Sequence, residues 1–184
     1  MIYMIGGAPR SGKSILAQQF AAQQRIGWIS TDVLKEVLKV NDDSGLQGQW
    51  NAEAEAITAA AVWFFPYLER FVWGINSLAD DYLIEGVHFL PAQVNRLSAQ
   101  YPIRTVFLGC SQMTIERFDQ FPGRSRGYAN LSEAMRRRIA DDIPLWSEFI
   151  MQEARQLGYP YIDMRFDFLS RLSEAEAVLT ADTN

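Results

Sequence analysis

The sequence predicts a three-layer α/β fold in which a five-stranded parallel sheet is wrapped by helices. Short apolar runs typical of strands alternate with longer segments of helical periodicity. Alternation of this kind favours a parallel sheet with helices packed on it. The length of 184 residues suits one domain with a sizeable core, and we expect residues 1–184 to form that single domain.

The expected elements follow one another without a repeat or a low-complexity segment. Strands are predicted at Ile2–Gly6, Gly27–Ser30, Tyr82–Glu85, Ile103–Gly109 and Tyr159–Asp163. Helices are predicted at Lys13–Gln24, Asp32–Val40, Asn51–Leu78, Pro91–Gln100 and Leu131–Leu157. A last helix is expected to begin near Ser173, because Ser173–Glu176 has the spacing of a capping box.

The long helix shows one apolar stripe at helical spacing, which predicts a buried face. The stripe consists of Ile57, Ala61, Phe64, Leu68, Phe71, Ile75 and Leu78. Three aromatic residues, Trp63, Tyr67 and Trp73, lie partly off it. They would either add to the core, form a dimer contact or line a substrate pocket.

Composition and charge exclude several classes of protein. The net charge of −5 argues against a general binder of nucleic acids or anionic membranes, because such partners need a broad basic surface. The single cysteine, Cys110, allows no disulfide within the chain. We find no signal-peptide pattern, and the most apolar stretch, 56–68, is too short to cross a bilayer. These features lead us to expect a cytoplasmic protein.

The opening motif predicts a site for nucleotide phosphates. Residues 7–14, GAPRSGKS, match the pattern G-x-x-x-x-G-K-[ST] between an apolar strand and a helix, which is the phosphate-loop context. Such a loop points backbone N–H groups inward, and the helix N-terminus adds partial positive charge. Lys13 is expected to reach the β- and γ-phosphates, and the Ser14 hydroxyl to ligate Mg²⁺. The predicted nucleotide-binding residues are Gly7, Ala8, Pro9, Arg10, Ser11, Gly12, Lys13, Ser14 and Ile15.

Two carboxylates lie at the carboxyl ends of the second and third predicted strands, where ligands gather in open parallel sheets. Asp32 follows the second strand and could take a proton from an acceptor hydroxyl, or it could cap the next helix. Glu85 ends the third strand and could act near Mg²⁺, position the acceptor, or be satisfied by backbone donors. Lys35 either binds an anionic acceptor or is a solvated charge. His88, the only histidine, either contacts the acceptor or has a structural role.

Residues 114–137 concentrate arginines and are predicted to form a short lid. Phosphoryl transfer needs positive charge on the migrating group and exclusion of water, and a mobile lid supplies both. Arg124 and Arg126, which lie between Gly123 and Gly127, are the expected catalytic arginines. The three consecutive residues 136–138 point in different directions on a helix, so they cannot all serve one site.

These motifs resemble the P-loop small-molecule kinases, the group that includes adenylate kinase, chloramphenicol phosphotransferase and zeta toxins. The stretch GGAPRSGKS resembles the phosphate loop of that group, and IERF followed by GRSR is similar to the start of its lid. The stretches STDVLKEVL and IEGVHFLP are similar, more narrowly, to 2-phosphoglycerate kinase, although Lys35 stands where arginine is expected. The likeness extends over most of the chain and is sharp at the first two or three motifs.

The resemblance implies a P-loop NTPase fold and an ATP- and Mg²⁺-dependent phosphotransferase. By matching position, Gly12, Lys13 and Ser14 would bind phosphate and metal, Asp32 would be the base or an acceptor ligand, and Arg117 would lie on the adenine side of the lid. The predicted function is transfer of the γ-phosphoryl group of ATP to a hydroxyl of a small metabolite. We expect a monomer or homodimer with no nucleic-acid or membrane partner.

Two other functions use the same phosphate loop. The first is a nucleotide-dependent switch or ATPase, although the chain lacks the N-K-x-D element of GTPase-type switches. The second is a kinase of the toxin or antibiotic type, in which the chemistry is the same and the acceptor differs.

Overall fold

The computed structural model describes residues 1–41, 52–78, 81–120 and 130–181. Its centre is a five-stranded sheet with the strand order β2-β3-β1-β4-β5, in which every neighbouring pair is parallel. The predicted parallel sheet is therefore confirmed. The strands are β1 (Ile2–Gly7), β2 (Gly27–Ser30), β3 (Tyr82–Gly86), β4 (Ile103–Gly109) and β5 (Tyr161–Asp163).

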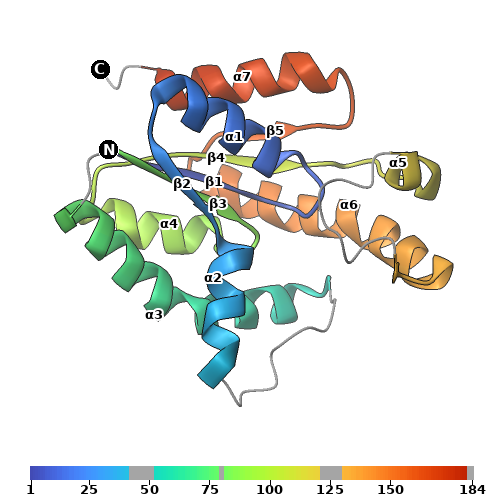
Figure 1. Ribbon diagram of the computed structural model, residues 1–184. Coiled ribbons are helices and arrows are strands. Elements are labelled where there is room, and N and C mark those ends of the chain that lie inside the picture. Colours follow the sequence, from blue (N-terminus) through green and yellow to red (C-terminus); the bar gives the residue numbers. More distant parts are fainter. Residues whose placement is uncertain (42–51, 79–80, 121–129, 182–184) are drawn as a thin grey trace.

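Helices cover both faces of the sheet, as Figure 1 shows. Side chains alternate along β1, so Ile2 and Met4 pack toward one helical layer while Tyr3 and Ile5 pack toward the other. The first layer consists of α3 (Ala54–Leu78), α4 (Pro91–Ser98) and α6 (Glu133–Gln156). The second consists of α1 (Lys13–Gln24) and α7 (Phe168–Thr180). The three-layer architecture is thus confirmed.

The helix α2 (Thr31–Leu38) leaves the end of β2 and points away from the sheet (Figure 1). Its N-cap is Ser30, whose hydroxyl oxygen accepts a hydrogen bond from the backbone N–H of Asp32. Among its residues only Thr31 is buried, and a 3₁₀ turn, Lys39–Asn41, follows it. Thr31 anchors the first turn of α2, and the partly buried Leu34 and Leu38 pack against the core further along the helix.

Several helix boundaries differ from the prediction. The last helix begins at Phe168, and the hydroxyl of Ser173 donates to the carbonyl of Leu169 inside the helix. The prediction of a start near Ser173 is wrong, because Phe168 and Leu172 already pack against the α1 side of the sheet. On α3, the expected stripe is buried from Ile57 to Ile75 except for Phe71, which is half-buried, whereas Leu78 is 86% exposed.

Two segments bear on the predicted lid. The short helix α5 (Ile115–Gln120) packs against α6 through Phe118 and Ile143, and the sequence prediction contains no helix at this position. The predicted catalytic residues Arg124 and Arg126 lie outside the described residues.

Within the described ranges, none of the helices is long and apolar enough to cross a membrane.

Candidate active site

The phosphate-loop motif connects β1 to α1, as predicted. Gly7 and Gly12 have φ angles of 135° and 92°, in the left-handed region that favours glycine. A Cβ atom on Gly7 would lie 1.9 Å from the carbonyl oxygen of Leu108, and one on Gly12 would lie 2.8 Å from the ring of Phe168. Both glycines of the motif are therefore required by the backbone angle and by the space available.

Lys13 is buried inside this loop. Its Nζ donates to the carbonyl oxygen of Ala8 at 2.6 Å, and the Ser11 hydroxyl donates to the same oxygen at 2.8 Å. Burial lowers the pKa of the Lys13 amine, while the carboxylates of Glu85 and Asp32 oppose that shift. The loop thus holds an amine on which two acidic side chains from other elements act electrostatically.

Ser14 and Glu85 form a pair across the sheet edge. The Ser14 hydroxyl donates to Glu85 Oε1 at 3.0 Å, and Glu85 is only 2% exposed. Strand pairing explains this meeting, because Glu85 on β3 lies opposite Ile5 on β1, just before the loop. Glu85 therefore lies beside the phosphate loop, and its role toward a metal stays a prediction.

The Ser14–Glu85 pair fits a Mg²⁺ ion. Two oxygen ligands on adjacent corners of a Mg²⁺ octahedron lie about 3 Å apart, which matches the observed oxygen–oxygen distance. The described residues contain no group of three or more His, Cys, Asp or Glu side chains able to hold a metal. Because Mg²⁺ in phosphate-binding sites usually takes one or two protein ligands, a serine and a glutamate suffice.

Asp32 lies at the second position of α2, with its side chain 72% exposed. Ser30 occupies the N-cap, so the alternative interpretation of Asp32 as the cap is wrong. Asp32 Oδ1 lies 3.5 Å from Nδ1 of His88, and its charge acts on Lys13. An accessible carboxylate at the start of α2 therefore lies within electrostatic range of Lys13 in the phosphate loop.

His88 and Lys35 complete this group. His88 is 8% exposed, its Nδ1 lies 2.9 Å from Thr31 Oγ1, and its ring centroid lies 5.5 Å from that of Phe64. Burial lowers the pKa of His88 to about 4, against the opposing effect of Asp32. Lys35 is half-buried, and burial together with Lys39 lowers the pKa of its amine. The structure brings Asp32, Lys35 and His88 together, and their roles toward an acceptor stay predictions.

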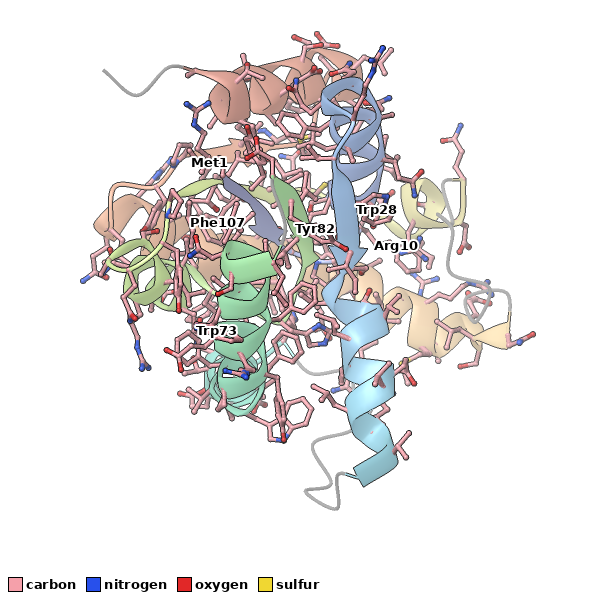
Figure 2. All side chains as sticks on the ribbon, turned by 60° about the vertical axis from the view of Figure 1, so that its left-hand side comes forward. Met1, Arg10, Trp28, Trp73, Tyr82 and Phe107 are labelled. Atoms are coloured by element: carbon pink, nitrogen blue, oxygen red, sulfur yellow. The ribbon has the colours of Figure 1, made fainter. Side chains whose placement is uncertain are left out.

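Arg117 of α5 forms hydrogen bonds to the segment that follows β5. Its guanidinium donates to the carbonyl oxygens of Met164, at 3.1 Å, and Arg165. Figure 2 shows Arg10 on the side of the molecule that carries α5, and its guanidinium carbon lies 5.1 Å from the ring centre of Phe118. The adenine-side role of Arg117 stays a prediction.

The three arginines at the start of α6 serve three separate contacts. Their partners are Asp119 for Arg136, Glu133 for Arg137 and Asp142 for Arg138, at 2.9, 3.2 and 3.8 Å. This divergence agrees with the expectation that consecutive helical residues cannot all serve one site.

Of the remaining predicted nucleotide ligands, Pro9 is half-buried and Ile15 is 39% exposed.

The sequence analysis missed two residues that shape the site. Thr31 is fully buried, and its hydroxyl contacts His88. A Cβ atom on Gly86 would lie 1.7 Å from Thr31 Oγ1, so only glycine fits at the end of β3. In the sequence, their positions next to Asp32 and Glu85 were the one indication that these two residues belong to the site.

A cavity of about 310 Å³ lies elsewhere, between α3 and α4. Its lining residues are Val62, Phe65, Pro66, Glu69, Gln93 and Arg96. None of them belongs to the phosphate loop or to the Asp32 group. This cavity is therefore not the nucleotide site.

Comparison with known proteins identifies the fold. No family model and no curated protein matches the chain. A solved gluconokinase from Sinorhizobium meliloti 1021 aligns with a TM-score of 0.58 at 13% identity, over 96% of this chain and 90% of that chain. The chain has the P-loop kinase fold. A shikimate kinase from Acinetobacter baumannii in complex with shikimate aligns with a TM-score of 0.54 at 16% identity, over 97% and 90% of the two chains. Shikimate kinase from Aquifex aeolicus VF5 aligns with a TM-score of 0.53 at 15% identity, over 97% of this chain and 96% of that chain.

Proposed function

We propose that the protein is an ATP- and Mg²⁺-dependent small-molecule kinase that transfers the γ-phosphoryl group to a hydroxyl of a small anionic metabolite. One observation carries the proposal. Lys13, the Ser14–Glu85 pair and the carboxylate of Asp32, which does not cap α2, lie at the same edge of the sheet. The kinases among the solved structures with this fold support it.

The phosphate loop binds the nucleotide in this proposal. Its N–H groups and the N-terminus of α1 receive the phosphates, and the Lys13 amine supplies a positive charge. Ser14 and Glu85 would hold Mg²⁺, which neutralises charge on the transferred group when it is bound. Arg117, Arg124 and Arg126 would contribute from the lid, on the adenine side and at the phosphates.

Asp32 acts as the base toward the acceptor. Its carboxylate accepts the hydroxyl proton while the hydroxyl oxygen bonds to the γ-phosphorus and ADP leaves. Exposure of the Asp32 side chain gives an acceptor access to it, whereas the buried Glu85 stays with Ser14. The two carboxylates therefore have separate tasks, one toward the acceptor and one toward the metal.

The charges on α2 favour an anionic acceptor. Lys35 follows Asp32 by one helical turn and is half-buried, so its ammonium group is positioned near the base and partly withdrawn from water. The neighbouring Lys39 is paired with Glu36, so Lys35 is the cation of α2 that is available to an acceptor. Together with the sequence similarity to 2-phosphoglycerate kinase, this favours an acceptor that carries a carboxylate or phosphate beside its hydroxyl group.

The proposal needs no nucleic-acid or membrane partner and suits a monomer or a homodimer. The buried free thiol of Cys110 fits a reducing cytoplasm.

The test is ATP consumption with Mg²⁺ against a panel of hydroxyl compounds. The panel contains phosphoglycerates and other anionic compounds, neutral sugars, nucleosides, and drugs of the aminoglycoside and chloramphenicol types. We expect ADP to form with an anionic acceptor, and Lys13→Ala to lower kcat/KM at least about 1,000-fold, because a preorganised cation at the phosphates is lost.

Two outcomes would contradict this proposal. ATP binding without turnover of any acceptor would favour a switch. Turnover of neutral drugs alone would favour a kinase of the antibiotic type.

A further inference from the structure

An efficient base needs a fixed orientation, and Asp32 by itself does not have one. Its side chain is 72% exposed on a helix that points away from the sheet. An exposed carboxylate exchanges among several rotamers, and only some of them face an acceptor. A neighbouring group that restricts Asp32 would therefore contribute to the reaction.

His88 is itself held firmly by the core. It follows the end of β3, is 8% exposed, and packs its ring against Phe64, which is fully buried. The rings meet at 46° with centroids 5.5 Å apart. The imidazole is therefore a rigid group directed from β3 toward α2.

One nitrogen of this ring faces two oxygen atoms of the first turn of α2. His88 Nδ1 lies 2.9 Å from Thr31 Oγ1 and 3.5 Å from Asp32 Oδ1. The first distance is that of a hydrogen bond, and the second is an electrostatic contact. A nitrogen lone pair would repel the carboxylate, so these two contacts together favour the tautomer with the proton on Nδ1, in which Nδ1–H donates a hydrogen bond to Thr31 Oγ1.

The charges around His88 are compatible with a neutral ring. Asp32, Lys35 and Lys39 act on it from α2 and the following turn, and Lys13 acts from α1. Glu36, also on α2, is within electrostatic range. With burial as the dominant effect, the ring is uncharged at neutral pH, and Nε2 carries no proton when Nδ1 does.

Thr31 connects this ring nitrogen to the backbone beside Asp32. Thr31 is fully buried, and its hydroxyl occupies the space that Gly86 leaves open at the end of β3. The contact joins β3, His88 and the first turn of α2 in one packed unit. A change at His88 would therefore be transmitted to the residue next to Thr31, which is Asp32.

We propose that His88 is a positioning residue for Asp32, whose carboxylate it orients through an Nδ1–H group shared with Thr31. The inference rests on the proposed function in one respect, namely that Asp32 is the base. It assigns His88 to the base rather than to direct binding of the acceptor.

The first test is spectroscopic and needs no activity. His88 is the only histidine of the chain, so ¹⁵N-histidine labelling of the full protein gives a single imidazole signal set. We expect a neutral ring protonated at Nδ1 at pH 7, and a shifted Nδ1–H resonance in Asp32→Asn. A ring protonated at Nε2, or a signal that Asp32→Asn leaves unchanged, would overturn the proposal.

The second test uses three replacements of His88. Asparagine places an amide N–H close to the position of Nδ1, glutamine places one close to Nε2, and leucine removes both. We expect His88→Asn to retain most of kcat, and His88→Gln and His88→Leu to lower kcat about 10- to 100-fold, as for other supporting partners of functional groups. The affinity for ATP, measured by titration, stays unchanged in all three.

A double variant distinguishes positioning from a general structural effect. If His88 acts through Asp32, His88→Leu causes no further loss of kcat in an Asp32→Asn background. Equal losses in all three replacements, or a full additional loss in the double variant, would contradict the proposal. If wild-type protein transfers phosphate to no acceptor, the proposed function fails, and the spectroscopic result still decides the role of His88.

Discussion

The carboxylates of Glu85 and Asp32 differ in their exposure to solvent and in their partners, and we assign them separate tasks for this reason. Glu85 is 2% exposed and accepts a hydrogen bond from the Ser14 hydroxyl, whereas Asp32 is 72% exposed and lies beside the buried His88. The positions of both carboxylates were predictable, because Glu85 lies near the carboxyl end of one apolar strand and Asp32 lies just after another. The choice between base and helix cap for Asp32 was not predictable, since Ser30 and Asp32 are both good capping residues.

The burial of His88 predicts a specific dependence of stability on pH. Its pKa is about 4 in the folded protein against an ordinary value of 6.5, so between these values the unfolded chain binds more protons. The free energy of unfolding should therefore fall as the pH decreases from 6.5 to 4. The contribution of His88 to this fall is about 3 kcal/mol at most.

Urea denaturation at pH values between 7 and 4.5 measures this effect. His88→Asn is the matched control, because it keeps every carboxylate of the wild type and removes only the titrating ring. We expect the loss of stability on acidification to be smaller in the variant. Equal losses in the two proteins would show that His88 does not resist protonation.

Among the secondary-structure elements, the attachment of α2 matters most to the site. The helix carries Asp32 and Lys35, and it meets the sheet through Thr31, which fits against Gly86. The sequence pattern predicted α2 but not this attachment, because a contact between β3 and α2 depends on how the strands pair.

Glycine substitutions test that attachment. Gly86→Ala would place a Cβ atom 1.7 Å from Thr31 Oγ1 and should lower the free energy of unfolding by about 2 kcal/mol or more. Gly74→Ala in α3 is the control, because a Cβ atom there meets nothing within 4 Å. The control should stabilise the protein by about 0.5–1 kcal/mol, since alanine favours a helix more than glycine does. If the free energy of unfolding, measured by denaturation, changed in the same direction in the two variants, this account would be contradicted.

The wrong boundary of α7 has a physical explanation of the same kind. Ser173–Glu176 has the spacing of a capping box, yet the packing of Phe168 and Leu172 against the core extends the helix by about one and a half turns toward the N-terminus. Local capping signals compete with tertiary packing, and packing decides here. The apolar period that begins at Phe168 was the better signal.

In the whole molecule, the strand order creates the site. With β3 between β2 and β1, the ends of three adjacent strands deliver Asp32, Glu85 and the phosphate loop to one edge. The sequence predicted a parallel sheet from alternation alone, whereas the order arises from pairings between residues about 80 positions apart, such as Ile2 with Tyr82. The shared fold with gluconokinase and shikimate kinase extends over nearly the whole chain.

The central claim is that the phosphate loop and Asp32 together transfer phosphate to a hydroxyl group. The most direct measurement follows the label from [γ-³²P]ATP in the presence of Mg²⁺ and the best acceptor of the panel, with wild type and Asp32→Asn compared at equal ATP occupancy. We predict a labelled phosphate ester with the wild type, and a loss of about 100- to 10,000-fold in the variant with its ATP affinity intact. Label that appears only as inorganic phosphate, or transfer by Asp32→Asn at the wild-type rate, would contradict the account.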